Sequence, residues 1–142
     1  MKAVFVTQEV DPASPVLGAT VAKIAALAGQ VDEVVVLADR AVDGALPSNC
    51  RVRLFRSRTR PGRGLRFEAA LAAETARGRP AFVLAHMCPI YAVLAAPVAR
   101  PLGCPVLLWF THWRRSRLLA LAERLSSAVI TVEERSFPLP SR

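Results

Sequence analysis

Short apolar runs that alternate with helical patterns constrain the fold of this 142-residue chain more than any other feature. The runs are rich in Val, Leu and Phe, which is typical of strands covered on both faces in a parallel sheet. Strands are predicted over residues 2–7, 33–38, 51–55, 82–86, 105–111 and 128–132. Because helical segments separate these strands, we predict an α/β fold: a Rossmann-like, doubly wound, mostly parallel six-stranded sheet with helices on both faces.

Apolar residues at helical spacing predict the helices between the strands. The segment "IYAVLAAPVAR" is apolar on all sides and contains Pro97, so we expect a buried, kinked helix there. The other predicted helices are one through Val21, Ile24 and Leu27 or Ala28, one from about Gly64 to Ala76 with Phe67, Ala70 and Leu71 on its apolar face, and one over 115–126 with an apolar stripe of Leu118, Leu121, Ala122 and Leu125.

Composition is that of a globular domain, with 53% hydrophobic and 21% charged residues. The apolar runs are shorter than the roughly 18 to 20 residues that a membrane span needs, and the start lacks a signal-peptide pattern, so we expect a cytoplasmic protein. The predicted domain covers residues 1–135, and a proline-rich tail or interdomain linker covers 136–142. Cys50, Cys88 and Cys104 are widely spaced, which predicts free thiols and supports neither a disulfide framework nor a zinc site.

Positive charge is concentrated in one segment of a chain whose formal net charge is +8. Residues 51–66 contain no acidic side chain, and such a segment suits anionic lipid head groups, a phosphorylated ligand or nucleic acid. A solvated basic loop is an alternative of equal weight. The arginines of the segment are Arg51, Arg53, Arg56, Arg58, Arg60, Arg63 and Arg66.

Both histidines of the chain lie at the carboxyl ends of predicted strands. His86 ends "FVLAH" and His112 comes directly after "PVLLWFT". In open α/β sheets ligands bind beyond the carboxyl ends of the strands, so this placement predicts a site that includes His112. A long loop after the first strand, "TQEVDPASPVLGAT", carries Gly18 at a helix start, where a phosphate is favoured. The dinucleotide, P-loop and nucleophile-elbow motifs are all absent.

Several quoted segments carry a resemblance to a known family. The order of "VFVTQEVDP", "SPVLGATVAKIAALA", "LAHMCPIYAVLAAPVAR", "CPVLLWFTHW" and "AVITVEERSFPLPSR" resembles the amino-terminal domain of a retaining, family 4 glycosyltransferase of the GT-B fold. The resemblance implies an acceptor-side domain that shapes one wall of a cleft, with a donor-binding domain outside this chain. It implies transfer of a sugar from a nucleotide-sugar to an acceptor hydroxyl.

The resemblance also assigns roles to residues. His112 corresponds to the family's cleft histidine, the catalytic position beside the donor sugar, and Thr111 next to it is a donor-binding position. Leu17 and Gly18 correspond to the loop near the sugar diphosphate, although family members often have two glycines there. The positions on the acceptor side are His86, Met87, Glu133 and Glu134.

Charge stabilisation and positioning dominate this kind of chemistry, so neither a metal nor another cofactor is expected. The implied partners are a nucleotide-sugar, a sugar or lipid-linked acceptor, and a carboxy-terminal donor domain in the same or another chain. A basic face formed by Arg51, Arg53, Arg56, Arg58, Arg60 and Arg63 suits attachment to an anionic inner membrane surface.

Two alternatives to a transferase domain remain. One is a stand-alone Rossmann-like binding module without catalysis, which the missing donor domain favours. The other is a basic nucleic-acid-binding protein, against which the single aromatic of the arginine segment, Phe55, counts. A domain that lacks its partner across a cleft also exposes apolar surface, so self-association is a further expectation.

Overall fold

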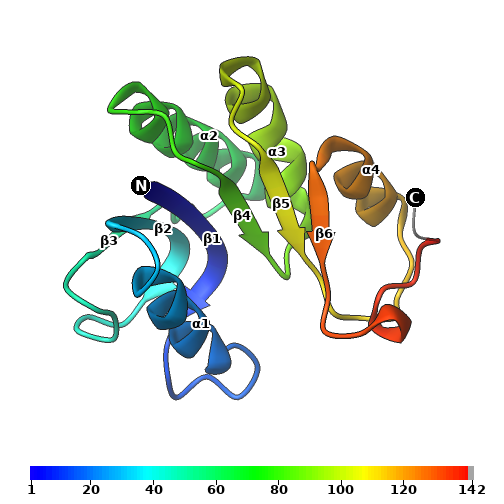
Figure 1. Cartoon of the computed structure of the whole chain (residues 1–142), viewed down its shortest axis with the longest axis horizontal. Coiled ribbons are helices and arrows are strands. Elements are labelled where there is room, and N and C mark those ends of the chain that lie inside the picture. Colours follow the sequence, from blue (N-terminus) through cyan, green and yellow to red (C-terminus); the bar gives the residue numbers. More distant parts are fainter. Residues whose placement is uncertain (141–142) are drawn as a thin grey trace.

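Six parallel strands form one sheet with the order β3-β2-β1-β4-β5-β6 in the computed structural model, which describes residues 1–140 (Figure 1). The fold class predicted from the sequence is confirmed. The strands are β1 Lys2–Val10, β2 Glu33–Ala41, β3 Cys50–Leu54, β4 Val83–His86, β5 Val106–Trp109 and β6 Ala128–Ile130. Because all strands run the same way, their carboxyl ends meet at one edge of the sheet.

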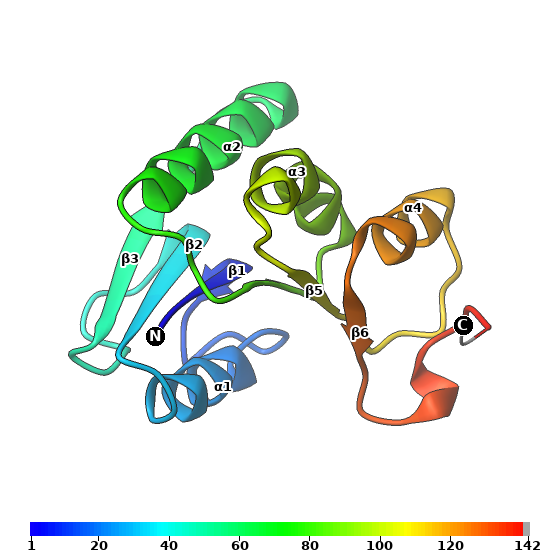
Figure 2. The same ribbon diagram turned by 45° about the horizontal axis from the view of Figure 1, so that its top comes forward.

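Helices cover the two faces of the sheet unequally. Figure 2 shows α2, α3 and α4 together on one face and α1 on the other. The helices are α1 Ala19–Ala28, α2 Arg60–Ala76, α3 Pro89–Ala99 and α4 Arg117–Leu125, with short 3-10 turns at Arg100–Leu102 and Glu134–Ser136. The chain builds β1, β2 and β3 outward and then crosses through α2 to β4, so the strand order reverses between β1 and β4.

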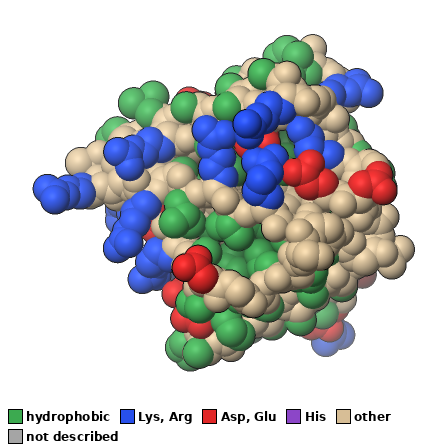
Figure 3. Space-filling model, turned by 90° about the vertical axis from the view of Figure 1, so that its left-hand side faces the viewer, with side chains coloured by type: hydrophobic (Ala, Val, Ile, Leu, Met, Phe, Trp, Pro, Cys, Tyr) green, Lys and Arg blue, Asp and Glu red, His purple; other side chains and the backbone are tan. Residues whose placement is uncertain are grey.

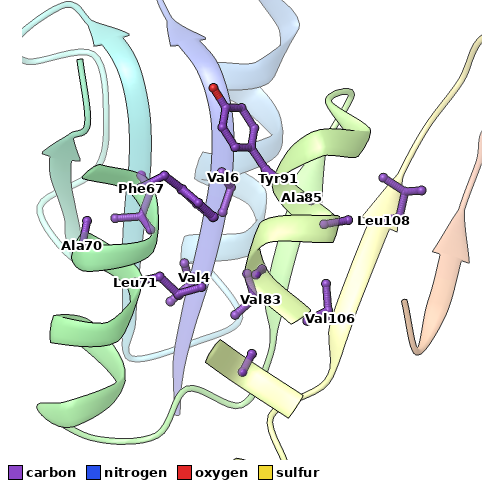
Figure 4. Close-up of a cluster of buried hydrophobic side chains, with 14 of the residues drawn as sticks. Val4, Val6, Phe67, Ala70, Leu71, Val83, Ala85, Tyr91, Val106 and Leu108 are labelled. Atoms are coloured by element: carbon purple, nitrogen blue, oxygen red, sulfur yellow. The ribbon is translucent and has the colours of Figure 1, made fainter. Parts of the chain in front are cut away.

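Strand alternation divides the core between the two faces. Val4 and Val6 point from β1 into the larger cluster beneath α2 and α3, where Phe67 and Tyr91 also lie (Figure 4). Phe5 points the other way and joins Ile24 of α1 in the smaller cluster. This alternation explains why every residue of β1 from Ala3 to Thr7 is buried.

The face covered by α1 is incomplete over β5 and β6. Leu107, Trp109 and Ile130 belong to the smaller cluster but are only partly buried. At the end of the chain, Phe137 and Leu139 pack against the larger cluster, so part of the segment predicted as a tail is packed on the domain. Ser141 and Arg142 of that segment lie outside the described residues.

No helix in the described part of the chain is long and apolar enough to span a membrane.

Candidate functional site

His112 lies in the loop between β5 and α4, at the carboxyl edge of the sheet, and its side chain is exposed. Its Nδ1 accepts a hydrogen bond from the Arg114 backbone N–H at 3.1 Å. A neutral imidazole held in this way carries its proton on Nε2. His112 therefore presents one defined N–H donor, which suits a hydrogen bond to a ligand oxygen.

Met87 joins the ends of two central strands. It follows β4 directly, and its N–H donates to the Trp109 carbonyl of β5 at 2.7 Å. The Thr111 hydroxyl donates to its Sδ at 3.4 Å. Met87 is also the only described non-glycine residue with positive φ, at 59°. Such a backbone conformation is strained by roughly 1–3 kcal/mol, and strained residues often gather at ligand sites. The structure thus places Met87 in contact with Thr111, the residue directly before His112.

His86, unlike the exposed His112, is buried, with only 2% of the residue exposed. Its ring lies 5.4 Å from the Phe5 ring and 5.8 Å from the Trp109 ring, and Lys23 Nζ lies 3.1 Å from its Nε2. Burial, together with the Lys23 charge, lowers the pKa of His86 to about 4. His86 is therefore a neutral, packed side chain, and the predicted acceptor contact would require this cluster to open.

Gly18 is needed for the packing of its own loop. A Cβ at this position would lie 2.6 Å from the Ser14 carbonyl oxygen and 3.0 Å from that of Pro12. The Leu17 N–H donates to the Ser14 hydroxyl at 3.1 Å, which ties the loop to the start of α1. The loop is at the carboxyl edge as predicted, but its own carbonyl groups fill the space beside Gly18.

Glu133 and Glu134 are both exposed, at the turn that follows β6. The Glu133 N–H donates to the Ser136 hydroxyl at 3.2 Å, and this hydroxyl lies 2.7 Å from that of Thr131. The Glu133 carboxylate in turn accepts from the Ser136 backbone N–H, so it also caps this turn. The predicted contact of Glu133 and Glu134 with an acceptor stays a prediction.

The arginine segment divides into two parts in the structure. Arg51 and Arg53 point from β3 toward α2, where both donate to the buried carboxylate of Glu74. Arg51 also donates to Glu33 at 3.0 Å. These two arginines are neutralised by acidic partners, so they contribute little to an anion patch.

Four of the remaining arginines, Arg56, Arg58, Arg63 and Arg66, line a cavity of about 1030 Å³ at the carboxyl edge, between the ends of β1, β2 and β3 and the start of α2. Basic side chains gather on this side of the molecule, which carries the edge strand β3, with acidic and apolar side chains among them (Figure 3). Arg60 lies outside the cavity, at the first position of α2, and is exposed. The cavity is lined by Gln8, Asp39, Arg40, Arg56, Ser57, Arg58, Arg63 and Arg66.

Sequence reasoning missed the part of this cavity that comes from β1 and β2. Asp39 and Arg40 sit at the end of "EVVVLADR", and Gln8 sits near the end of β1. Their position after apolar strands is the signal that could have identified them, in the same way that it identified the histidines.

Within residues 1–140, no group of three His, Cys, Asp or Glu side chains is arranged to hold a metal ion. The three cysteines are free thiols.

Comparison with known proteins gives a likeness of fold. No family model and no curated protein matches the chain. The UDP-GlcNAc 2-epimerase from Methanocaldococcus jannaschii superposes with a TM-score of 0.66 and 14% identity, over 96% of this chain and 40% of the epimerase. MurG from Acinetobacter baumannii gives a TM-score of 0.65 and 16% identity, over 100% of this chain and 44% of MurG. A UGT transferase from Siraitia grosvenorii in complex with UDP gives a TM-score of 0.51 and 23% identity, over 76% of this chain and 23% of the transferase.

These proteins share a fold with the chain, which is a Rossmann-like GT-B half-domain. The chain spans about two fifths of the length of the epimerase.

Proposed function

We propose that this chain is the acceptor-side domain of a retaining, family 4-like glycosyltransferase, which works with a donor-binding domain in the same or another chain. The observation that carries the proposal is the presentation of His112 after β5, with its Nδ1 held by the Arg114 N–H. The likeness of fold to MurG and to a UGT transferase in complex with UDP supports the coarser part of the proposal, a domain of a glycosyltransferase-like protein.

In this function the residues after β4 and β5 form the wall of the cleft. The Nε2–H of His112 donates to a hydroxyl of the donor sugar and holds the anomeric carbon near the acceptor. Met87 and Thr111, which contact each other at 3.4 Å, fix the spacing of the two strand ends. Positioning of this kind lowers the barrier because the reacting groups no longer need to find one another.

Attachment to the inner surface of a membrane is part of the proposal. Arg58 and Arg60 are exposed at the start of α2, and Leu65 on the same helix is 69% exposed. Basic groups beside an exposed leucine suit an anionic lipid surface. Flotation with phosphatidylglycerol and with phosphatidylcholine vesicles tests this part, since equal binding to both would contradict it.

The central test is calorimetric titration of the chain and of His112→Ala with UDP, GDP, ADP and their glucose conjugates. Because the proposed division of labour puts the nucleotide on the donor-binding domain, we expect dissociation constants weaker than about 1 mM for residues 1–142 alone and no preference among nucleotides. Tight, nucleotide-specific binding that His112→Ala weakens would overturn the proposal and support a stand-alone binding module.

A further inference from the structure

The cavity at the ends of β1, β2 and β3 has an excess of positive charge that the protein itself leaves unmatched. Five arginines line it, against the single carboxylate of Asp39. Arg40 is 3.8 Å from Glu9, and Arg63 Nε is 3.4 Å from Asp39 Oδ1, so these two arginines have an acidic neighbour. Arg66 donates to the Arg56 backbone carbonyl and pairs with no acidic group of residues 1–140.

Arg56 and Arg58 stand out within this group. Neither guanidinium has a hydrogen bond or an ion pair within residues 1–140, whereas Arg51 and Arg53 of the same segment are both paired with Glu74. Like charges held close together without counter-charges repel one another, and an anion that binds between them removes this cost.

The start of α2 adds a second source of positive potential. Thr59 caps this 17-residue helix by accepting from the Gly62 N–H at 3.1 Å, and Arg63 and Arg66 extend from its first two turns. The amino end of a helix favours an anion nearby. A Cβ at Gly62 would lie 2.5 Å from the Ser57 hydroxyl oxygen, so a glycine keeps the cavity wall close to the helix start.

Size and lining narrow the kind of ligand. A volume of about 1030 Å³ is at the upper end of ordinary small-molecule sites, so the cavity has room for far more than an inorganic phosphate. None of the lining residues is aromatic, which leaves a nucleobase without a stacking partner. Gln8, Asp39 and Ser57 instead offer groups that hydrogen-bond hydroxyls.

We infer that this cavity binds a phosphomonoester carried by a polyol, with Arg56, Arg58 and Arg66 around the phosphate and Gln8, Asp39 and Ser57 toward the hydroxyls. A phosphomonoester carries nearly two negative charges at neutral pH, which the guanidinium groups match in charge and in fork geometry. The inference depends on the cavity and goes beyond the proposed sugar transfer.

Calorimetric titration with glucose 6-phosphate tests the inference. We expect binding by the unmodified chain, at least tenfold weaker binding by Arg56→Ala/Arg58→Ala, and unchanged binding by the matched control Arg77→Ala/Arg100→Ala. Arg77 and Arg100 follow the ends of α2 and α3, at the opposite edge of the sheet, and their removal changes the net charge equally. Glucose should not bind, and inorganic phosphate and UMP should bind at least tenfold more weakly than glucose 6-phosphate.

Equal weakening in both double variants, or binding of UMP as tight as that of glucose 6-phosphate, would overturn the inference. So would the absence of glucose 6-phosphate binding. That result leaves the proposed transfer function standing, because the nucleotide titration with His112→Ala decides that function separately.

Vesicles distinguish a soluble ligand from a lipid head group. Phosphatidylinositol 4-phosphate vesicles present a phosphomonoester on a polyol, and phosphatidylglycerol vesicles adjusted to the same charge present none. Stronger binding to the former, reduced by free glucose 6-phosphate, assigns the cavity to a lipid head group. Equal binding to the two kinds of vesicle, while glucose 6-phosphate binds, assigns it to a soluble ligand, and both results support the shared phosphomonoester chemistry. A preference for phosphatidylinositol 4-phosphate vesicles that glucose 6-phosphate leaves unchanged would contradict the inference.

Discussion

Arg51 of β3 and Glu74 of α2 form a two-point ion pair, with Arg51 Nη1 donating to Oε1 and Nη2 donating to Oε2, each at 2.8 Å. Arg53 Nη1 adds a third bond to Oε1 at 3.1 Å. The Glu74 side chain is fully buried, while the two arginine side chains remain about 40% exposed. The carboxylate therefore holds the edge strand β3 against α2 through charge-assisted hydrogen bonds.

Replacing Glu74 with alanine should destabilise the domain by about 2 kcal/mol. The loss is moderate because Arg51 and Arg53 are exposed enough to be solvated once their partner is gone. Urea unfolding followed by tryptophan fluorescence measures this effect. Glu68→Ala on the same helix is the control, with an expected change within about 0.5 kcal/mol. Equal effects from the two substitutions would contradict a structural role for the ion pair.

The same ion pair predicts how stability depends on pH. Hydrogen bonds from Arg51 lower the pKa of Glu74 from 4.5 to about 2, against the opposing effect of burial. A lowered carboxyl pKa gives stability that is fully present above pH 4.5 and lost as the pH falls toward 2. The difference in unfolding free energy between the unmodified chain and Glu74→Gln should therefore shrink between these two values. A difference that stays constant across this range would rule out the predicted coupling.

The buried His86 should titrate far below its ordinary range. Burial and the nearby Lys23 charge lower its pKa from 6.5 to about 4, so the folded state binds this proton less readily than the unfolded state. The contribution to stability is therefore complete above pH 6.5 and is lost as the pH falls through 4. Proton NMR of the chain and of His112→Ala assigns the two histidine resonances. The His86 resonance should not shift between pH 8 and about 5, and a midpoint near 6.5 would contradict its burial.

Most of the fold could be predicted from the sequence because strands buried on both faces give unmistakable apolar runs. The predicted strand starting at Lys2 and the one starting at Glu33 both exist, and each continues three residues beyond its predicted end. Polar residues such as Gln8 and Asp39 hid these extensions, since a strand that passes out of the covered region no longer needs apolar side chains. The start of α2 was placed late for a related reason, because Pro61 and Gly62 in its first turn look like a loop.

The site could be predicted less well, because sequence position fixes the edge of the sheet but not the orientation of a side chain. His86 is the last residue of β4 and His112 follows β5, yet the first is buried and the second is exposed. Strand alternation explains the burial of His86, which points to the face under α1 where Phe5 and Trp109 pack against it, whereas His112 lies in the loop beyond β5. The separation of Arg51 and Arg53 from Arg56 and Arg58 depends on Glu74, which lies far along the chain and gives no local signal.

Gly18→Ala should disturb the loop before α1. The added Cβ would meet the Ser14 carbonyl at 2.6 Å, and backbone atoms cannot move aside as a side chain can. We expect a destabilisation of about 1–3 kcal/mol, measured by thermal unfolding. Gly29→Ala at the end of α1 is the control, because its nearest contact is an ordinary 3.5 Å. A loss of stability in Gly29→Ala as large as in Gly18→Ala would contradict this reason for the glycine.

Helix α4 provides the clearest test of orientation, because the sequence predicted the wrong leucine on its buried side. The expected stripe included Leu118 and Leu121, which are 39% and 44% exposed, whereas Leu119 is fully buried beside Ala122. The Ser116 hydroxyl caps the helix by accepting from the Leu119 N–H at 3.0 Å, and this start sets the rotation of the residues that follow.

Leu119→Ala should therefore cost about 2–5 kcal/mol by leaving a cavity in the larger cluster, while Leu118→Ala should change the unfolding free energy by less than about 1 kcal/mol. Chemical unfolding of the two variants side by side measures the difference. A larger loss from Leu118→Ala would mean that Leu118, and not Leu119, lies on the buried side of α4, and would contradict this orientation of the helix.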